Sequence, residues 1–223
     1  RGPLDVACFS TFTVKWLIPR LFDFQARHPG IEVRLRTTDA GTDAKRQHGD
    51  LVITAEEATG ALDASREQRL FAEHLGPVLS PELAQRVALQ QPTDLADLAL
   101  APLRLHTRTR RNAWALWGAA VGATVPLPTS SQAGPEFEHY YFTLEAAVRG
   151  LGIAVAPWHL VMDDVRAGRL LAPLGFVASG YDYVLRRRAV AHPRIEVFCT
   201  WLLAQAGDTP VPPGPPGELA PDR

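Results

Sequence analysis

The sequence predicts an α/β fold in which helices cover both faces of largely parallel sheets. Two observations lead to this prediction. Short apolar runs with the length of buried strands alternate along the chain with longer amphipathic segments, as strand–helix units require. Hydrophobic residues make up 46% and charged residues 21% of the 223 residues, which is enough for a sizeable core. This composition excludes a disordered chain, a collagen and a coiled coil.

The first half of the chain opens with a strand followed by a helix. Four strands are expected, over Leu4–Phe9, Ile31–Arg36, Leu51–Ile53 and Leu75–Leu79. The first helix carries a broad apolar face made of Phe12, Trp16, Leu17, Leu21 and Phe24. Ser10 or Thr11 is expected to cap this helix, and Pro19 inside it predicts a kink or a restart. Ser80 precedes a proline that suits the first position of another helix.

The second half repeats this alternation. Strands are expected over Ala99–Leu105, Ile153–Ala156 and Tyr181–Leu185, and helices over Arg111–Val121, Tyr140–Arg149 and Pro193–Gln205. Pro157 is expected to open one more helix. From Gly207 onward the chain holds six of its 19 prolines, so residues 207–223 are expected to form an extended tail that buries almost nothing.

Charge and apolar patterning exclude several classes of protein. The net charge is -1, with 23 basic and 24 acidic residues, which argues against a chain that grips nucleic acid by itself. No apolar run is long enough to span a bilayer, and the start at Arg1 lacks a signal-peptide pattern. Cys8 and Cys199 lie among apolar neighbours. We therefore expect two buried thiols in a reducing cytoplasm, without a membrane partner.

Motifs for catalysis are missing from the sequence. There is no nucleophile elbow, no phosphate-binding loop and no dinucleotide fingerprint. Glu136, Glu138 and His139 lie close together, but such spacing is common, and we expect no metal, no cofactor and no catalytic residue. The run Arg186–Arg188 is interpreted as a solvated strand end in preference to a nucleic-acid patch. The sequence thus favours a binding protein over an enzyme.

Polar residues follow three of the expected strands. Ser10 and Thr11 follow the first strand and open a helix, whose free backbone N–H groups would suit a carboxylate or another anion. Residues 54–56 follow the strand at Leu51–Ile53, and residues 139–141 open a later helix. Ligands of open α/β sheets bind outside the carboxyl ends of the strands. A plain helix cap at Ser10 remains an equally good interpretation.

Several segments in a fixed order carry a resemblance to a known family. They are TFTVKWLIPRLFDFQARHPGIEVRLRT (11–37), GDLVIT (49–54), LGPVLSPELA (75–84), PTDLADL (92–98), the pair Trp114 and Trp117 with Gly118, GPEFEHYYFTLEAAVRGLGIAVAP (134–157) and GRLLAPL (168–174). With these segments the chain resembles the effector-binding domain of LysR-type transcriptional regulators. The similar branch includes regulators of glycine cleavage and of β-lactamase expression. Order and spacing carry the match, which covers most of residues 3–206.

The resemblance implies a type 2 periplasmic-binding-protein-like fold, with two Rossmann-like lobes joined by two crossover strands. Lobe I would hold residues 1–78 and 184–206, and lobe II residues 79–183, with 207–223 as the extended tail. The resemblance also implies a ligand-sensing domain that binds a small effector, expected to be a carboxylate, in the cleft between the lobes. The effector-binding residues would be Ser10, Thr11, Thr38, Thr54, Glu56, His106, His139, Tyr140 and Tyr141.

The family pattern also implies partners. The domain would form a homodimer, and the whole regulator would form either a dimer or a tetramer. It would reach DNA through an N-terminal winged helix-turn-helix that this sequence does not contain. The chain departs from the pattern at Tyr140 and Tyr141, where small polar residues that cap the next helix are usual. Bulky rings there would shrink the cleft or favour a flat apolar effector.

Three alternatives stay open on the sequence alone. A solute-binding receptor of the periplasmic type has the same architecture but needs export. An enzyme of a related two-lobed fold, such as a deaminase or a dehydratase, would need a reactive group in the cleft. Cys8 is the candidate for this group because it lies near a strand end. A degenerate domain that binds no ligand and only dimerises is the third.

Overall fold

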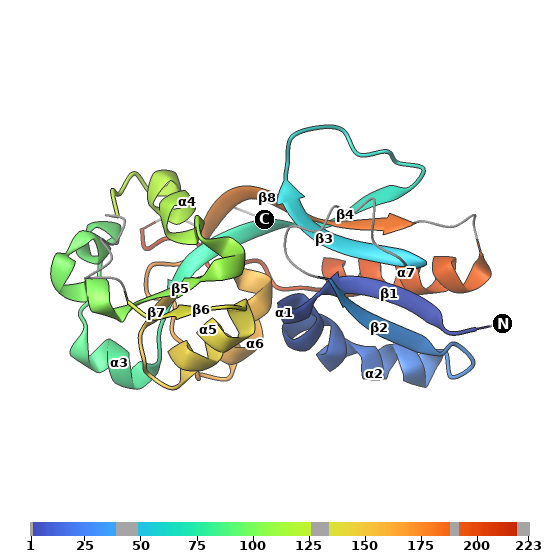
Figure 1. The fold of residues 1–223 in the computed structure, drawn as a ribbon, viewed down its shortest axis with the longest axis horizontal. Helices are drawn as coiled ribbons and strands as arrows, with labels where there is room; N and C mark the ends of the chain where they lie inside the picture. The colour runs from blue at the N-terminus through green and yellow to red at the C-terminus, as the bar shows by residue number, and fades with distance from the viewer. Residues whose placement is uncertain (1, 39–48, 126–133, 188–191, 218–223) are drawn as a thin grey trace. The chain divides into compact units, whose positions relative to one another are not determined.

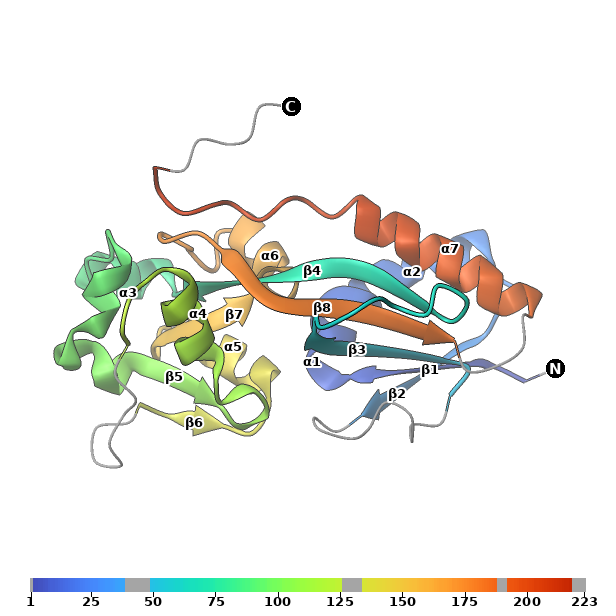
Figure 2. The same cartoon turned by 90° about the horizontal axis from the view of Figure 1, so that it is seen from above.

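The computed structural model describes residues 2–38, 49–125, 134–187 and 192–217 and divides them into two compact units (Figure 1). Unit 1 contains residues 2–73 and 180–210, and unit 2 contains residues 74–179 and 211–217. Strands β4 (Glu67–Val78) and β8 (Val177–Arg187) are neighbours in the sheet and carry the chain from one unit to the other (Figure 2). The two-lobed α/β fold with two crossover strands is therefore confirmed.

The sheet of unit 1 is mixed, with the strand order β2-β1-β3-β8-β4. Its first three strands are β1 (Leu4–Phe9), β2 (Val33–Thr38) and β3 (Leu51–Glu57). Strand β1 lies between β2 and β3 and is parallel to both, as the alternation of strands and helices predicts. Strand β8 is antiparallel to β3, which the sequence analysis did not foresee. The difference arises because the chain returns to unit 1 along β8 without a crossover helix.

A continuous helical segment follows β1 in three parts. The α-helical turn α1 (Ser10–Phe12) leads into a π-helical turn (Thr13–Leu17) and then into helix α2 (Ile18–Arg27). Pro19 occupies the start of α2, so the predicted restart at this proline is confirmed. A proline has no N–H to donate and its ring clashes with the carbonyl one turn back, which accounts for the wider turn before it.

The cap of this segment differs from the prediction. The residue at the N-cap position is Phe9, and Ser10 is already helical. Within the described residues no side chain caps this first turn, so the expectation that Ser10 or Thr11 caps the helix was wrong. The backbone N–H groups of the first turn consequently have no internal acceptor from a side chain.

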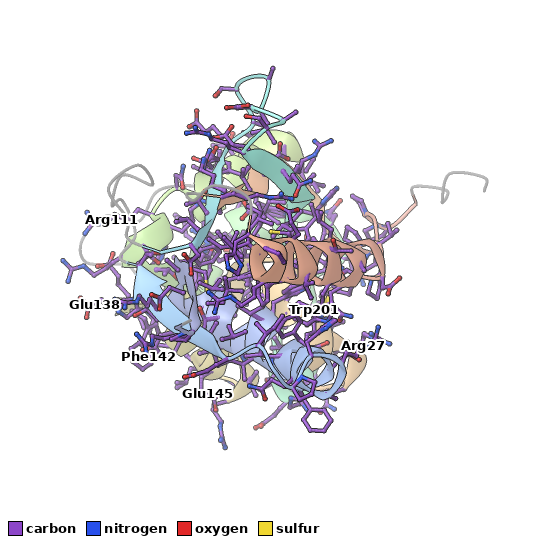
Figure 3. The ribbon with its side chains drawn as sticks, turned by 90° about the vertical axis from the view of Figure 1, so that its right-hand side faces the viewer. Arg27, Arg111, Glu138, Phe142, Glu145 and Trp201 are labelled. Atoms are coloured by element: carbon purple, nitrogen blue, oxygen red, sulfur yellow. The ribbon has the colours of Figure 1, made fainter. Side chains whose placement is uncertain are left out.

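Two clusters of aromatic rings lie in unit 1. In the first cluster Phe12 contacts Phe9, Trp16, Phe71 and Tyr183, with ring centroids 5.1 to 6.2 Å apart. The other cluster joins α2 to helix α7 (Pro193–Gly207), which are both seen in Figure 3. There Phe24 packs on Phe198 and Trp201 at 5.0 Å, and Trp201 Nε1 donates a hydrogen bond to Asp23 at 2.9 Å.

The sheet of unit 2 has the order β4-β7-β5-β6. Strands β5 (Arg104–Thr107), β6 (Glu136–Phe137) and β7 (Ile153–Pro157) are parallel to one another, and β4 is antiparallel to β7. The helices are α3 (Pro81–Arg86), α4 (Ala113–Ala120), α5 (Tyr140–Val148) and α6 (Trp158–Arg166). The expected start at Ser80 is confirmed, because its Oγ accepts a hydrogen bond from the Leu83 N–H at 3.1 Å.

The strand expected over Ala99–Leu105 was wrong for most of its length. Residues 98–103 form 3-10 turns, and β5 begins only at Arg104. Asp97 accepts a hydrogen bond from the Ala99 N–H at 2.9 Å, which starts a helical turn where a strand was expected. Pro102 cannot donate to a sheet, so an apolar run at this place does not extend the strand.

Candidate functional site

In unit 1 three hydroxyl-bearing residues lie together at the carboxyl ends of parallel strands. Ser10 and Thr11 follow directly after β1, and the register pairs Phe9 of β1 with Thr38 of β2. Thr11 is buried, whereas Ser10 and Thr38 are partly exposed. The structure thus brings together Ser10, Thr11 and Thr38 around a helix start without a side-chain cap, an arrangement that suits an anionic ligand.

Thr54 and Glu56 lie elsewhere than the sequence predicts. They were expected in a loop after Ile53. In the structure β3 continues to Glu57, because it pairs with β8 up to the residue pair Glu57 and Tyr181. Both side chains are therefore held within a sheet. The expectation of a short strand ending at Ile53 was wrong.

The side chains of Thr54 and Glu56 belong to an ion-pair network around Arg186 of β8. Arg186 Nη1 donates to Thr54 Oγ1 at 2.7 Å and to Glu56 Oε2 at 2.6 Å, and a second bond joins Nη2 to Glu56 Oε1. Arg186 Nε donates to Glu67 Oε1 of β4 at 2.7 Å. The guanidinium therefore lowers the pKa of both carboxyl groups, and they in turn raise the pKa of Arg186.

Arg187, the next residue of the run Arg186–Arg188, is also paired with a carboxylate. Arg187 Nη1 donates to both carboxylate oxygens of Glu196 at 2.6 and 2.7 Å. The interpretation of this run as a solvated strand end was therefore wrong for Arg186 and Arg187. Arg188 lies outside the described residues. Pairing partners from α7 and from distant strands are not visible in a local sequence pattern.

A cavity of about 150 Å³ lies beside the Arg186 network, entirely within unit 1. Its charged lining residues are Glu56, Glu57, Glu67, Asp182 and Arg186. Four carboxylates against one guanidinium make the cavity negative, so it repels the carboxylate that the sequence analysis expects as effector. The uncapped helix start at Ser10 is the better place in unit 1 for an anion.

Replacing Arg186 with glutamine is expected to lower the free energy of unfolding at pH 7 by about 1 to 2 kcal/mol. The depressed pKa values of Glu56 and Glu67 mean that the network stabilises the fold above their unfolded value of 4.5. That contribution is lost as the pH falls through the pKa values of these groups in the folded chain. The difference in free energy of unfolding between the variant and the unmodified chain should therefore shrink in acid. Urea unfolding at pH 7 and at pH 3.5 measures this difference.

The matched control for this prediction is Arg149→Gln. Arg149 pairs with Glu145 at 3.0 Å, but both side chains are exposed on α5, so little change is expected at either pH. A difference for Arg186→Gln that is equally large at both pH values would show that the lost stability comes from packing and not from the ion pairs.

In unit 2 the corresponding edge is formed by the end of β5 and the start of α5. Thr107 at the end of β5 and Thr143 on α5 share a hydrogen bond between their hydroxyls at 2.7 Å. His106 precedes Thr107 and pairs in register with Glu136 of β6. Burial lowers the pKa of His106, and its Nε2 is buried without a hydrogen bond among the described residues. The imidazole is therefore neutral at pH 7.

The three aromatic residues at the start of α5 have different environments. Tyr140 is buried and its hydroxyl donates to the Val155 carbonyl at 3.0 Å, so it belongs to the core of unit 2. Tyr141 stacks on His139 with ring centroids 5.5 Å apart and contacts the exposed Phe142, labelled in Figure 3, at 4.3 Å. Helix α5 begins without a side-chain cap, as its residues predict. Unlike Tyr140, the rings of His139 and Tyr141 are partly exposed.

Thr107, Thr143 and Arg186 were not predicted as members of these sites. Thr107 lies beyond the strand expected over Ala99–Leu105, and Thr143 lies in an expected helix with no motif around it. Only the packing of α5 on β5 joins their hydroxyls. Its place shortly after the end of an expected strand is the one local signal that points to Thr107. The actual end of β5 at Thr107 lies two residues beyond the predicted one.

Cys8 is not an activated nucleophile. It is buried, its Sγ lies 2.7 Å from Thr13 Oγ1, and burial raises the pKa of its thiol to about 11. Burial also raises the pKa of Cys199 to about 11. Both groups are protonated thiols at neutral pH, whereas a catalytic cysteine needs a lowered pKa.

The described residues also bear on metal binding and on membrane insertion. Among these residues no group of three histidine, cysteine, aspartate or glutamate side chains is placed to hold a metal ion. Glu136, which the sequence analysis considered in this respect, lies 3.8 Å from the guanidinium of Arg108. None of the helices described in the structure combines the length and the apolar character needed to cross a membrane.

Comparison with known proteins identifies the family. The model of the LysR substrate binding domain matches residues 1–207. The chain belongs to this family. Among curated relatives, the HTH-type transcriptional regulator TrpI of Pseudomonas aeruginosa is 38% identical over 206 residues, which are 92% of this chain and 68% of that protein. The glycine cleavage system transcriptional activator of Escherichia coli (strain K12) is 32% identical over 210 residues, with 92% and 66% covered.

Solved structures agree with the LysR assignment. The effector domain of the regulator AmpR of Pseudomonas aeruginosa is similar with a TM-score of 0.72 and 31% identity, covering 93% of this chain and 96% of that one. The AmpR effector-binding domain of Citrobacter freundii has a TM-score of 0.73 at 28% identity, with 94% and 100% covered. The resemblance seen in the sequence is therefore confirmed. The printed names of these relatives are those of transcriptional regulators.

This LysR substrate binding domain spans about two thirds of the length of the curated relatives it matches. The relatives' own names describe a helix-turn-helix regulator and a transcriptional activator.

Proposed function

We propose that this domain senses a small anionic effector, with a carboxylate as the recognised group. The observation that supports this most is the edge formed by Ser10, Thr11 and Thr38, where a helix starts after β1 without a side-chain cap. Free N–H groups at a helix start and nearby hydroxyls together bind a carboxylate without needing a lysine or an arginine. The acidic cavity at Glu56 favours no such ligand.

Unit 2 offers a second set of groups of the same kind. Helix α5 also begins without a side-chain cap, beside Thr107 and Thr143, and His106 is neutral there. His139 and Tyr141 add a flat stacked pair of rings. We propose that these groups contact the less charged part of an effector, because aromatic faces and neutral imidazoles suit apolar or weakly polar groups.

The proposed response is a shift between conformations of the domain. An effector moves such an equilibrium only by the ratio of its affinities for the two states. The whole regulator would reach DNA through a helix-turn-helix part outside this sequence, as the name of the relative TrpI suggests, and would act in the cytoplasm. An enzyme of a related fold is disfavoured by the inert thiol of Cys8.

A thermal-shift screen against small carboxylates, amino acids and aromatic acids tests the effector site. An effector at a hundred times its Kd is expected to add roughly 2.7 kcal/mol of stability and to raise the Tm clearly. The double replacement Ser10→Ala with Thr11→Ala should abolish that rise, because it removes both hydroxyls at the helix start after β1.

The control variant is Thr59→Ala, which changes a threonine that lines the acidic cavity. It should keep the full ligand-induced rise in Tm. If the double alanine variant kept the rise while Thr59→Ala lost it, the effector would bind the acidic cavity and the site at Ser10 would be rejected.

We further propose that the domain pairs with a second copy through an apolar stripe on its first helical segment. Val14, Ile18 and Phe22 are spaced four residues apart and are 49%, 50% and 81% exposed. Such spacing puts them on one face of the helical segment. A contiguous exposed apolar stripe on a helix is typical of an interface between protein chains.

Replacing Phe22 with aspartate is expected to convert the dimer to a monomer, because the new charge would be buried without a partner in the interface. Sedimentation velocity over a range of concentrations measures the conversion. Leu151→Asp, which changes an isolated exposed leucine of unit 2, should leave the dimer intact. An unchanged dimer in the Phe22 variant would place the interface elsewhere.

A further inference from the structure

The proline-rich tail does not remain separate from the fold. Residues 211–217 form part of unit 2, although α7, which precedes them, belongs to unit 1 (Figure 2). The Phe176 N–H donates a hydrogen bond to the Pro213 carbonyl at 2.8 Å. The tail is therefore attached to unit 2 by its backbone, a contact that the composition of the tail does not predict.

The backbone conformation of Gly175 and its lack of a side chain allow this contact. Its φ is +64°, and a Cβ at this position would overlap the carbonyl of Gly214 and lie 2.7 Å from the nitrogen of Pro215. The tail backbone thus passes directly over Gly175, where only a glycine leaves room. A residue with a side chain would have both to adopt a left-handed conformation and to push the tail away.

The residues that contact the tail are closely packed within unit 2. Phe176 is buried and packs against Trp158 of α6, with ring centroids 5.1 Å apart. Gly76 of β4 lies against Gly175 and Phe176, since a Cβ on Gly76 would lie 2.7 Å from Phe176 Cδ1. The tail is therefore docked on residues that pack directly on one of the two strands linking the units.

The other end of the tail is tied to α7. The Asp208 N–H donates to the Ala204 carbonyl at 2.9 Å, and Thr209 Oγ1 donates to the Gln205 carbonyl at 3.0 Å. Only residues 210–212 then separate Thr209 from the docked Pro213. Three residues between two fixed points leave little slack, because a chain extends by at most about 3.6 Å per residue. Prolines stiffen this short link further.

We propose that residues 208–217 form a strap, a third covalent link between the units that restrains their relative movement. With β4 and β8 alone, the units are joined by two strands. A strap fixed at α7 and at Gly175 limits the range of conformations that the unliganded domain samples. A ligand that prefers an arrangement the strap disfavours must release the tail from Gly175, so the strap contributes to the equilibrium on which effector sensing depends.

Distances between spin labels on the two units test the strap. One label is attached at Arg27→Cys on α2 and the other at Arg149→Cys after α5, both exposed positions. The native thiols of Cys8 and Cys199 are buried and protonated and should stay unlabelled. Dilution with unlabelled protein removes distances between subunits. The full chain should give a narrow distance distribution, and a chain ending at Thr209 a broad one.

Two point variants separate the strap from a change in the stability of unit 2. Gly175→Ala should broaden the distribution like the truncation. Gly168→Ala is the matched control, since Gly168 is also left-handed, with φ +72°, but has open space around it, and it should keep the narrow distribution. A truncated chain with the narrow distribution of the full chain would overturn the proposal.

A peptide with the sequence of residues 208–217 adds a second decisive result. Added to the truncated chain, it can fill the surface at Gly175 but cannot tether the units. The distribution should therefore stay broad. If the free peptide restored the narrow distribution, the tail would act by packing on unit 2 alone, and the strap would be refuted. None of these outcomes depends on the identity of the effector or on the site at Ser10.

Discussion

Replacing Gly152 with alanine is expected to lower the free energy of unfolding of unit 2 by about 3 kcal/mol. Gly152 is buried immediately before β7, and a Cβ there would overlap the carbonyl of Leu103 and lie 2.8 Å from Leu105 Cδ2. The first of these neighbours is backbone, which cannot move aside like a flexible side chain. Urea unfolding monitored by tryptophan fluorescence measures the loss.

The control for this prediction is Gly30→Ala, at a glycine with no atoms within 4 Å of the new Cβ. It should cost little or nothing, because alanine also restricts the unfolded chain. The alanine at 152 should affect function as well, since it pushes β5 away from β7 where Arg104 pairs with Ile153, and β5 carries Thr107. Equal stability of both variants would contradict the close packing of these strands.

Replacing Phe12 with alanine is expected to lower the free energy of unfolding of unit 1 by about 3 to 5 kcal/mol. The ring is fully buried and contacts Trp16, Phe71 and Tyr183, which come from three different elements. Its removal opens a cavity that rigid aromatic neighbours do not fill. Thermal and urea unfolding measure the loss.

Phe142→Ala serves as the control because Phe142 is 47% exposed, and a loss within about 1 kcal/mol is expected for it. Phe12 also adjoins Thr11, so the cavity should loosen the helix start at which we propose that the effector binds. A small loss of stability at Phe12 would mean that the aromatic cluster closes around the gap.

The Arg186 network illustrates why a cluster of charged residues is not by itself a binding site. Thr54 and Glu56 have the residue types of a ligand site and stand near the carboxyl end of a strand. In the fold their polar atoms are already bonded to Arg186, so a ligand would have to break those bonds. Ser10 and Thr38 have no such competing partner among the described hydrogen bonds, which favours them as effector contacts.

Local features of the fold could be predicted from the sequence because their causes lie within a few residues. Pro19 lacks an N–H, so the helix restarts there whatever surrounds it. Ser80 caps α3 with its own hydroxyl. The apolar run of β1 and the apolar face of the helical segment after it needed no tertiary information. These features also carried the family resemblance, since they recur at fixed spacing.

The tertiary structure alone decided the features that depend on partners distant in sequence. Strand β3 extends to Glu57 because β8 pairs with it, and Thr54 and Glu56 are thereby removed from the loop in which a ligand was expected. Tyr140 is buried in the core of unit 2, where its hydroxyl donates a hydrogen bond to Val155 of β7. The tail docks at Gly175 although its composition suggests a free segment. Long-range pairing makes each of these choices, and a local pattern of residues does not encode which strand or glycine will meet it.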